Sequence, residues 1–226
     1  MSAYVIRPVG EDALLIELGS VVSEETHCAV LDLDDAIRAA GIAAVCETVP
    51  AYTSVLVRYD PELTSFDGLR LLCESLTSQP RRGDRVGNCH DVPVCFDASC
   101  APDLGEIAGR LGLTPEEFAR QFLAANFRIY MYGFAPGYAY MGGVPPALHQ
   151  PRKPAAVRGY PVGSVLVAGP QCLISTLPMP TGWWVIGRTP LTLLDRDSDK
   201  PPLFQPGDTV RFQRIDSEQF ARWNTL

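Results

Sequence analysis

From Phe127 onward, glycines and prolines divide the sequence into short β-like runs, and this punctuation limits the possible folds more than any other feature. The runs are FRIYMYGF, GSVLVAG, CLISTL, WWVIG and TVRFQRI. Runs of this kind, bounded by turn residues, are typical of all-β structure. We therefore predict an all-β barrel or sandwich, with the turn Pro206-Gly207-Asp208 leading into its last strand.

The first part of the chain alternates strand-like and helix-like segments instead. Short strands are expected at 4–9, 13–18, 42–49 and 54–59, where β-branched residues gather. Ser23 precedes two acidic residues, which predicts a helix from there to about Ala40. A second helix is expected over 65–76, where apolar residues have helical spacing. Paired strands covered by two helices make a small α+β domain.

A polar stretch with proline and glycine separates the two parts and shows no periodicity. We predict an N-terminal α+β domain over 1–80, a linker over 81–90 and a second domain over 91–226. The linker arginines Arg81, Arg82 and Arg85 are interpreted as solvated, with anion binding as the less favoured alternative.

The second domain is expected to open with the strand VPVCF and two short helices. The first helix is predicted over 102–111. Thr114 and Pro115 start the second, because a threonine N-cap followed by proline is a strong local start signal.

Composition excludes several classes of protein. The chain has 226 residues and a formal net charge of -7, which argues against nucleic acid as a partner because phosphates need a basic surface. We see no secretory signal and no apolar run long enough for a membrane span. Seven cysteines without paired spacing indicate reduced thiols, so we expect a cytoplasmic protein.

A metal site is not expected. Cys89, His90, Cys95 and Cys100 are close in sequence, but no C-x2-C pair exists and Cys95 falls in an apolar strand-like run.

The motifs of several enzyme classes are missing. The sequence has no phosphate-binding loop of the G-x-x-x-x-G-K-[ST] type and no G-x-S-x-G elbow. His27, His90 and His149 have no recognisable nucleophile or orienting group beside them, so we interpret each as an exposed surface residue rather than a catalyst.

Residues 134–190 combine aromatic rings, glycines and a few polar side chains. Glycines let a backbone turn or approach a ligand closely, and rings supply flat walls, so a small-ligand pocket is one interpretation. The other is that these residues only build tight corners of the β domain. Composition alone leaves both open.

Linked motifs run in one order through the second part: GFAPGYAYMGG, PRK, PVGSVLVAG-PQ, P-TGW-W-VIGRTPL and PPLFQPGDTVRF. The first part adds GEDALLIELG and VPAYTSVLVRYDP, and VPVCF is followed by PDLGEIAGRLGLTPEEF. In order and spacing these motifs resemble the KipI/PxpB family, also called allophanate hydrolase subunit 1. That family is similar to part of the carboxyltransferase region of urea carboxylases.

The resemblance implies an α+β fold, with a small α+β N-terminal domain followed by a cyclophilin-like β-barrel C-terminal domain. It implies a larger PxpC/KipA-like partner subunit and a PxpA-like subunit, which together with this chain would form a 5-oxoprolinase. That enzyme opens the lactam of 5-oxoproline to glutamate while hydrolysing ATP. ATP is therefore the implied cofactor, and its site could lie on a partner.

The resemblance also implies a binding site for a small amide or lactam, although it assigns no catalytic residue. Arg152 and Arg188 would hold an anion, because a guanidinium grips a carboxylate or phosphate with two parallel hydrogen bonds. Gln171 would orient a carbonyl or an amide. The remaining candidates are the wall residues Phe134, Tyr138 and Trp183, and Ser164 of the G-S-V motif.

Three positions depart from the family's pattern. Phe122 aligns with a usual histidine and cannot exchange protons. Ser175 replaces a tyrosine, and Thr181 replaces one glycine of P-G-G-W, which constrains the loop. The leading hypothesis is a subunit of an ATP-dependent lactam- or amide-opening hydrolase. The alternative is a non-catalytic regulator that binds and inhibits a histidine kinase, and Phe122 favours it.

Overall fold

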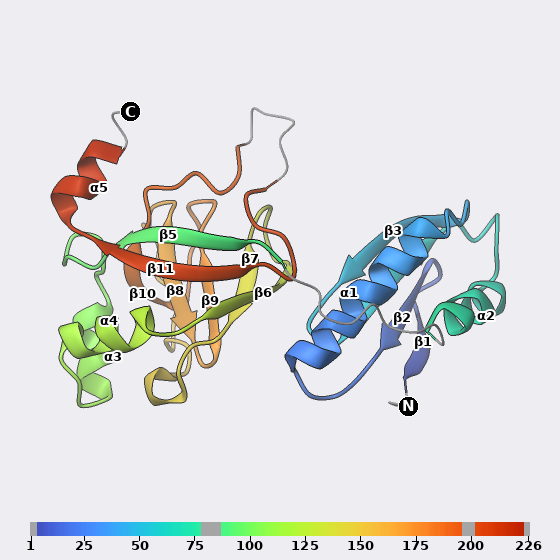
Figure 1. The fold of residues 1–226 in the computed structure, drawn as a ribbon, viewed down its shortest axis with the longest axis horizontal. Coiled ribbons are helices and arrows are strands. Elements are labelled where there is room, and N and C mark those ends of the chain that lie inside the picture. Colours follow the sequence, from blue (N-terminus) through green and yellow to red (C-terminus); the bar gives the residue numbers. More distant parts are fainter. Residues whose placement is uncertain (1–3, 78–86, 196–201, 224–226) are drawn as a thin grey trace. The chain divides into compact units, whose positions relative to one another are not determined.

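The computed structural model describes residues 4–77, 87–195 and 202–223. The chain divides into two compact units, Met1–Val86 and Gly87–Leu226 (Figure 1). Each unit has its own hydrophobic core.

The division falls within the predicted linker, 81–90. Strand β5 of the second unit starts at Cys89, so the last two linker positions belong to that strand. Arg81, Arg82 and Arg85 lie outside the described residues.

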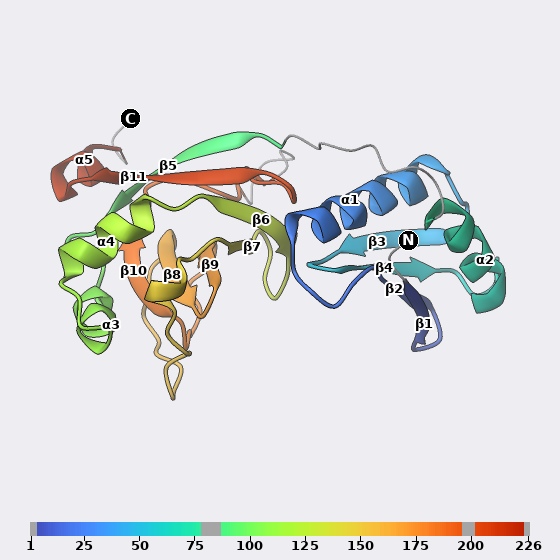
Figure 2. The same cartoon turned by 60° about the horizontal axis from the view of Figure 1, so that its bottom comes forward.

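The first unit contains an antiparallel sheet and two helices. The strands, in spatial order, are β1 (Val5–Val9), β2 (Ala13–Glu17), β4 (Ser54–Tyr59) and β3 (Val45–Pro50). The helices are α1 (Glu24–Ala39) and α2 (Phe66–Thr77), and α1 lies along the sheet (Figure 2). These elements match the predicted ones to within a few residues at each end.

Helix α1 begins as the sequence predicts. The Ser23 hydroxyl oxygen accepts a hydrogen bond of 3.1 Å from the backbone N–H of Thr26, which satisfies one of the open donors at the helix start. Apolar residues of α1 then pack on the sheet, because they recur at helical spacing. The buried set is Val30, Leu33 and Ile37 from α1 and Leu14, Ile16, Val55 and Val57 from the sheet.

The prediction that the histidines are exposed surface residues is wrong. His27 is fully buried on the inner face of α1, whose helical period turns this position toward the core. His90 is mostly buried, with Nε2 2.8 Å from Oδ2 of Asp208. His149 is half-buried, with Nε2 2.8 Å from the carbonyl oxygen of Val144.

In the described part of the second unit, the strands close into a barrel in the order β10-β5-β11-β6-β7-β9-β8 (Figure 1). Their bounds are β5 Cys89–Cys95, β6 Phe127–Tyr132, β7 Ala139–Gly142, β8 Ser164–Ala168, β9 Gln171–Ile174, β10 Trp184–Arg188 and β11 Thr209–Ile215. Strands β5 and β11 pair in parallel, and the other neighbours are antiparallel. A barrel, rather than a sandwich, is the form adopted, and the predicted α+β fold with a β-barrel is confirmed.

Short helices complete the second unit. They are α3 (Leu104–Arg110), α4 (Pro115–Leu123), a 3-10 turn (Pro146–Leu148) and α5 (Ser217–Trp223). Helix α4 has the expected start, because Thr114 and Glu117 each accept the other's backbone N–H. Helix α5 was not predicted, since it buries no residue and so has no apolar stripe. No helix in the described ranges is long and apolar enough to cross a membrane.

Side chains fill the barrel, so its interior is not a binding site. Alternate residues of β8, β9 and β10 point inward, among them Val165, Val167, Ile174 and Trp184. The residues between them point outward. Leu166, Leu173 and Val185 of this outward set form a separate apolar cluster with Trp183. The outer face of these three strands is therefore apolar, and its residues are buried beneath other segments of the chain.

Phe122 belongs to the interior core. It is fully buried on α4, with its ring centroid 4.7 Å from that of Phe127 and 5.0 Å from that of Phe212. A phenylalanine here supports packing, and the position does not face the pocket described below.

Candidate functional site

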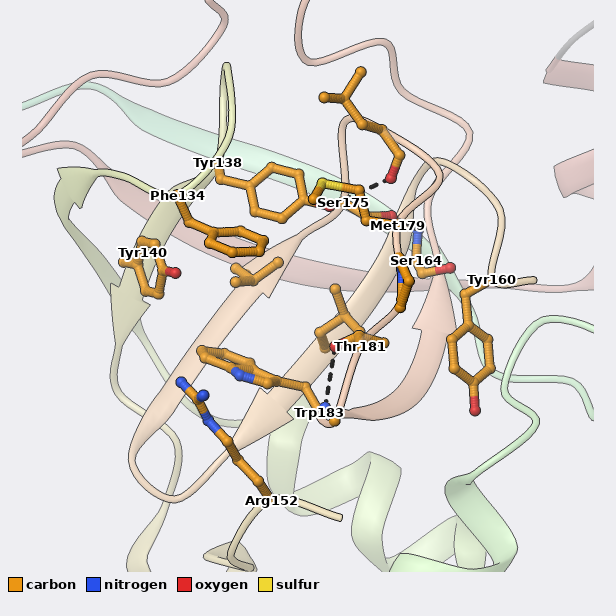
Figure 3. Close-up of a pocket in the computed structure, with 15 residues that line it drawn as sticks. Phe134, Tyr138, Tyr140, Arg152, Tyr160, Ser164, Ser175, Met179, Thr181 and Trp183 are labelled. Carbon is orange, nitrogen blue, oxygen red and sulfur yellow. Dashed lines mark hydrogen bonds between the residues drawn. The ribbon is translucent and has the colours of Figure 1, made fainter. Parts of the chain in front are cut away.

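A cavity of about 160 Å³ lies on the outer face of β8, β9 and β10 (Figure 3). Three loops cover it: the β6–β7 turn, the segment before β8 and the segment between β9 and β10. The lining residues are Phe134, Tyr138, Tyr140, Arg152, Tyr160, Ser164, Leu166, Leu173, Ser175, Leu177, Met179, Pro180, Thr181, Gly182 and Trp183. Aromatic walls with few polar groups are typical of small-molecule sites.

The β6–β7 turn presents Phe134 at the cavity. Phe134 has a φ of 68°, the left-handed region that a bulky residue rarely adopts, and the residue is 75% exposed. A hydrogen bond holds the turn in place, because the Thr176 hydroxyl donates to the carbonyl of Pro136 at 2.6 Å. Gly137, with a φ of 72°, lets the chain pass close to Leu194. The β6–β7 turn therefore keeps the apolar ring of Phe134 exposed to solvent.

Tyr138 and Tyr140 continue the aromatic wall. The ring centroid of Tyr138 lies 6.0 Å from that of Phe134, and its hydroxyl donates to the carbonyl of Leu177 at 3.3 Å. Burial raises the pKa of Tyr138, so the phenol is neutral at ordinary pH. Tyr140 meets Trp183 edge to face at 5.9 Å.

Arg152 is the cation of this site. Its guanidinium carbon lies 5.4 Å from the ring centroid of Trp183, and Figure 3 shows the two groups side by side. The side chain is exposed, and among the described residues it forms no ion pair. A guanidinium that stacks on a ring and lacks a carboxylate keeps its donors available for a ligand.

The segment that carries Arg152 is tied down on both sides. The indole N–H of Trp184 donates to the carbonyl of Pro151 at 2.8 Å. The backbone N–H of Lys153 donates to the carbonyl of Gly182 at 2.7 Å. Arg152 therefore projects from between two anchored neighbours, which limits the directions its side chain can take.

A second anchor is a mostly buried cluster around the carboxylate of Asp103. Its Oδ2 accepts from Nζ of Lys153 at 2.6 Å and from the backbone N–H of Val185 at 2.7 Å. The Tyr160 hydroxyl donates to the same carboxylate and accepts from Lys153 at 2.8 Å. We call these three side chains, Asp103, Lys153 and Tyr160, the tether, because they join the covering segment to β10 and to the start of α3.

The tether pairs one basic side chain, Lys153, with one acidic side chain, Asp103. Burial lowers the pKa of Lys153, but its hydrogen bonds and ionic attraction to Asp103 and its hydrogen bond to Tyr160 outweigh burial, so the pKa is raised overall. Burial also raises the pKa of Tyr160. The hydroxyl of Tyr160 points away from the cavity in Figure 3, so its ring forms the wall while its polar end serves the tether.

Three hydroxyls of the cavity hydrogen-bond to the backbone. Ser164 and Ser175 both donate to the carbonyl of Pro161, at 2.7 and 3.1 Å. The Thr181 hydroxyl oxygen accepts from the backbone N–H of Trp183 at 3.0 Å. The loop of Thr181 thus gains a hydrogen bond where the family's pattern has glycine. In the part of the chain that the structure describes, these three hydroxyls hydrogen-bond to backbone groups and not to a base that would make one of them a nucleophile.

The structure brings together five of the seven predicted site residues: Phe134, Tyr138, Arg152, Ser164 and Trp183. Gln171 stands at the start of β9, opposite Gly142 and Ala168, and does not line the cavity. Arg188 lines a different cavity, so the two arginines expected to hold an anion do not share one pocket.

Sequence reasoning missed the tether and Met179. Asp103 starts a helix, where an acid is ordinarily an N-cap, yet it makes no side-chain cap hydrogen bond to α3. Its partners lie 50 and 57 residues further along the chain. No local pattern could have joined them.

The described residues hold no group of three or more metal-ligating side chains that could bind an ion. No histidine lines the cavity. The fold and the site define a class: an α+β chain of two units whose filled β-barrel carries an aromatic-walled cavity on its outer face.

The chain belongs to the family of the carboxyltransferase domain, subdomain C and D, which matches residues 4–204. It is 31% identical over 228 residues to the B component of the 5-oxoprolinase of Bacillus subtilis, covering 96% of this chain and 95% of that one. The family resemblance seen in the motifs is thereby confirmed.

Solved structures share the fold. A conserved uncharacterised protein from Pyrococcus horikoshii is 33% identical and has a TM-score of 0.57, covering 96% of this chain and all of its own. The urea carboxylase of Kluyveromyces lactis has a TM-score of 0.75 over 97% of this chain at 16% identity, and this chain spans 22% of its length. The second likeness concerns the fold alone.

Proposed function

We propose that this chain is the substrate-binding barrel subunit of a 5-oxoprolinase-type hydrolase, an enzyme complex that opens a small lactam or amide at the expense of ATP. Support comes from the relatives named as the B component of 5-oxoprolinase, whose similarity runs through both units. The partners would be a larger PxpC/KipA-like subunit and a PxpA-like subunit, and the complex would work in the cytoplasm.

The observation that carries the proposal is Arg152 stacked on Trp183 with no carboxylate partner among the described residues, at a cavity of about 160 Å³. A lactam that bears a carboxylate has a flat amide, a short apolar ring and one negative charge. Arg152 would bind the carboxylate with two hydrogen bonds, and the rings of Tyr138 and Trp183 would enclose the apolar part. Size and charge both suit such a substrate.

The cavity also indicates a division of work between subunits. The hydroxyl protons of Ser164 and Ser175 are held by one carbonyl, and no histidine lines the cavity. The sequence has no G-x-x-x-x-G-K-[ST] loop for ATP. We therefore assign binding and orientation of the substrate to this chain, and the activation of the amide by ATP to the assembled complex.

The histidine-kinase regulator stays an untested alternative. Its one support in the sequence was Phe122, in place of a histidine. Because Phe122 is buried among Phe127 and Phe212, the substitution concerns packing of the barrel core and does not bear on the pocket.

The test is ATP-dependent release of glutamate from 5-oxoproline by this chain co-expressed with its candidate partner subunits. Activity should vanish when this chain is left out. Arg152→Gln should lower activity about 10- to 100-fold, since a charge-assisted hydrogen bond contributes about 1.5–3 kcal/mol. Arg158→Gln is the matched control, because Arg158 is exposed on the same segment and does not line the cavity.

Full activity without this chain would refute the proposal, and so would an Arg152→Gln complex as active as the Arg158→Gln complex. Histidine-kinase inhibition by the purified chain, with no oxoprolinase activity in the complex, would favour the regulator.

A further inference from the structure

A second cavity, of about 190 Å³, opens around Arg188 at the end of β10. It lies beside the pocket of Arg152, and Ser175 lines both. Its walls come from the turn before β8, the segment that follows β10 and helix α5. The lining residues are Val162, Gly163, Ser175, Thr176, Arg188, Thr189, Pro190, Leu191, Thr192, Leu193, Leu194 and Phe220.

Arg188 is held in place without being neutralised. Its Nε–H donates to the carbonyl of Val162 at 3.0 Å, and its guanidinium carbon lies 5.2 Å from the ring centroid of Phe220. In the described ranges it forms no ion pair, whereas Arg211 and Arg214 of the same unit pair with acidic side chains. The carbonyl and the ring fix the plane of the guanidinium, and its two terminal nitrogens are left as donors.

The rim beside Arg188 is rigid and supplies one more donor. Thr189 is buried, and its hydroxyl oxygen accepts from the backbone N–H of Leu191 at 3.2 Å, so its own proton can be donated elsewhere. Gly163 and Thr189 are joined by a backbone hydrogen bond of 2.9 Å. A Cβ at Gly163 would lie 2.4 Å from the carbonyl oxygen of Thr189, so only glycine allows this close contact.

The rest of the lining is mixed. Three further hydroxyl side chains, those of Ser175, Thr176 and Thr192, line the cavity, and the first two donate their protons to backbone carbonyls. Pro190, Leu191, Leu194 and Phe220 supply hydrocarbon surface next to the single guanidinium. A phosphate carries more negative charge than the single arginine can neutralise, and the hydrocarbon surface would leave part of its oxygens unpaired. A carboxylate needs two parallel donors, and a short hydrocarbon chain attached to it would cover the apolar wall.

We propose that the Arg188 cavity is a second ligand site, distinct from the pocket of Arg152, which binds a small carboxylate with a short apolar body. The terminal nitrogens of Arg188 bind the carboxylate in a bidentate manner. Thr189 adds a hydrogen bond, and Phe220 with the neighbouring leucines holds the hydrocarbon part.

The test is a titration of the full-length, nitrogen-15-labelled chain with propionate, followed by nuclear magnetic resonance at constant ionic strength. The reporters are the Nε–H of Arg188 and the backbone amides of Gly163 and Thr189. Propionate should shift these signals to saturation. Inorganic phosphate and chloride, used as comparison probes, should bind more weakly.

Arg188→Gln should weaken propionate binding about tenfold or more, since it removes the charge and the paired donors. Arg158→Gln is the matched control, because Arg158 is exposed and lines neither cavity, and this variant should bind propionate like the wild type. Phe220→Leu, on the surface helix α5, removes only the ring under the guanidinium and should weaken binding about threefold. The indole signals of Trp183 and Trp184 report whether each variant keeps its fold.

Three results would overturn the inference: equal propionate affinity in folded Arg188→Gln and wild type, tighter binding of phosphate than of propionate, or shifts confined to the signals around Trp183. If Arg188→Gln does not fold, Phe220→Leu and Thr189→Val decide, and wild-type affinity in both would refute the site. Because none of these variants alters Arg152, the outcome is separate from the test of the oxoprolinase proposal.

Discussion

The two cavities of the barrel use the same device, an arginine stacked on an aromatic ring, but they position it in different ways. Arg152 lies 5.4 Å from Trp183 and Arg188 lies 5.2 Å from Phe220. Arg188 belongs to β10, and a hydrogen bond to a backbone carbonyl fixes its guanidinium. Arg152 stands on a segment without regular secondary structure.

The difference teaches that the backbone of Arg152 is positioned by contacts of a covering segment, whereas the backbone of Arg188 is positioned by a strand of the barrel. The covering segment is held through Pro151, Lys153 and Tyr160, which bond to β10, to the segment before it and to Asp103. Changes to the tether should therefore disturb one cavity and spare the other.

The largest expected effect comes from Asp103→Asn. Lys153 would remain in a mostly buried position without its carboxylate, and breaking such a pair costs about 3–5 kcal/mol. We expect the free energy of unfolding to fall by about 3 kcal/mol in urea denaturation. The oxoprolinase activity of the complex should fall as well, with propionate binding at Arg188 retained.

Glu106→Gln is the control for Asp103→Asn, because Glu106 lies on α3 and pairs with Arg110 at the surface. Its unfolding free energy should change by less than about 1 kcal/mol. Equal effects of the two substitutions would show that the tether does not position the pocket.

Trp183→Leu should act on binding more than on stability. The leucine keeps an apolar wall but removes the ring beneath Arg152 and the edge-to-face contact with Tyr140. We expect about a tenfold rise in KM for the substrate of the complex, equivalent to about 1.4 kcal/mol. Steady-state kinetics measures this, and an unchanged KM with a reduced kcat would assign Trp183 another role.

The tether also predicts a loss of stability in alkali. A pKa raised in the folded state gives stability that is complete below the unfolded value, 10.5 for lysine, and is lost as pH rises through the folded value. The unfolding free energy should therefore fall above about pH 10.5. The unfolding free energy of Lys153→Met should fall less steeply with pH than that of the wild type, as thermal melts at pH 8 to 12 would show. Equal slopes for the two proteins would contradict the role of Lys153 in this loss of stability.

Ser175→Ala should have the smallest effect, and it should act on both cavities alike. The hydroxyl of Ser175 accepts from the backbone N–H of Ser164 and donates to the carbonyl of Pro161. Its removal should cost about 1 kcal/mol of unfolding free energy. The KM of the complex for its substrate and the propionate affinity of the Arg188 cavity should change by similar small factors, and a change confined to one would show that Ser175 does not form a shared wall.

Local signals predicted much of this fold. The cap at Ser23 and the paired caps at Thr114 and Glu117 lie where the sequence places them. Most strands also lie within the predicted runs. These features are determined by neighbours in sequence, which is why a single chain is enough to find them.

Local sequence patterns could not predict the features that depend on contacts between distant segments. The choice of a barrel over a sandwich depends on β5 pairing with β11, more than a hundred residues away. The separation of Arg152 and Arg188 into two cavities depends on the faces and ends of strands that only the closed barrel defines. Position-by-position transfer from the family named five residues that line the cavity of Arg152, but it grouped them with Gln171 and Arg188, which do not line it.

The parallel pairing of β5 with β11 has a consequence for synthesis on the ribosome. The sheet of the first unit joins strands within residues 5–59, so its partners emerge early and close together. The barrel cannot close until Thr209–Ile215 has emerged, and until then β5 offers an open edge. Contacts between such distant segments form slowly. During translation the second unit is therefore exposed to misfolding for longer than the first.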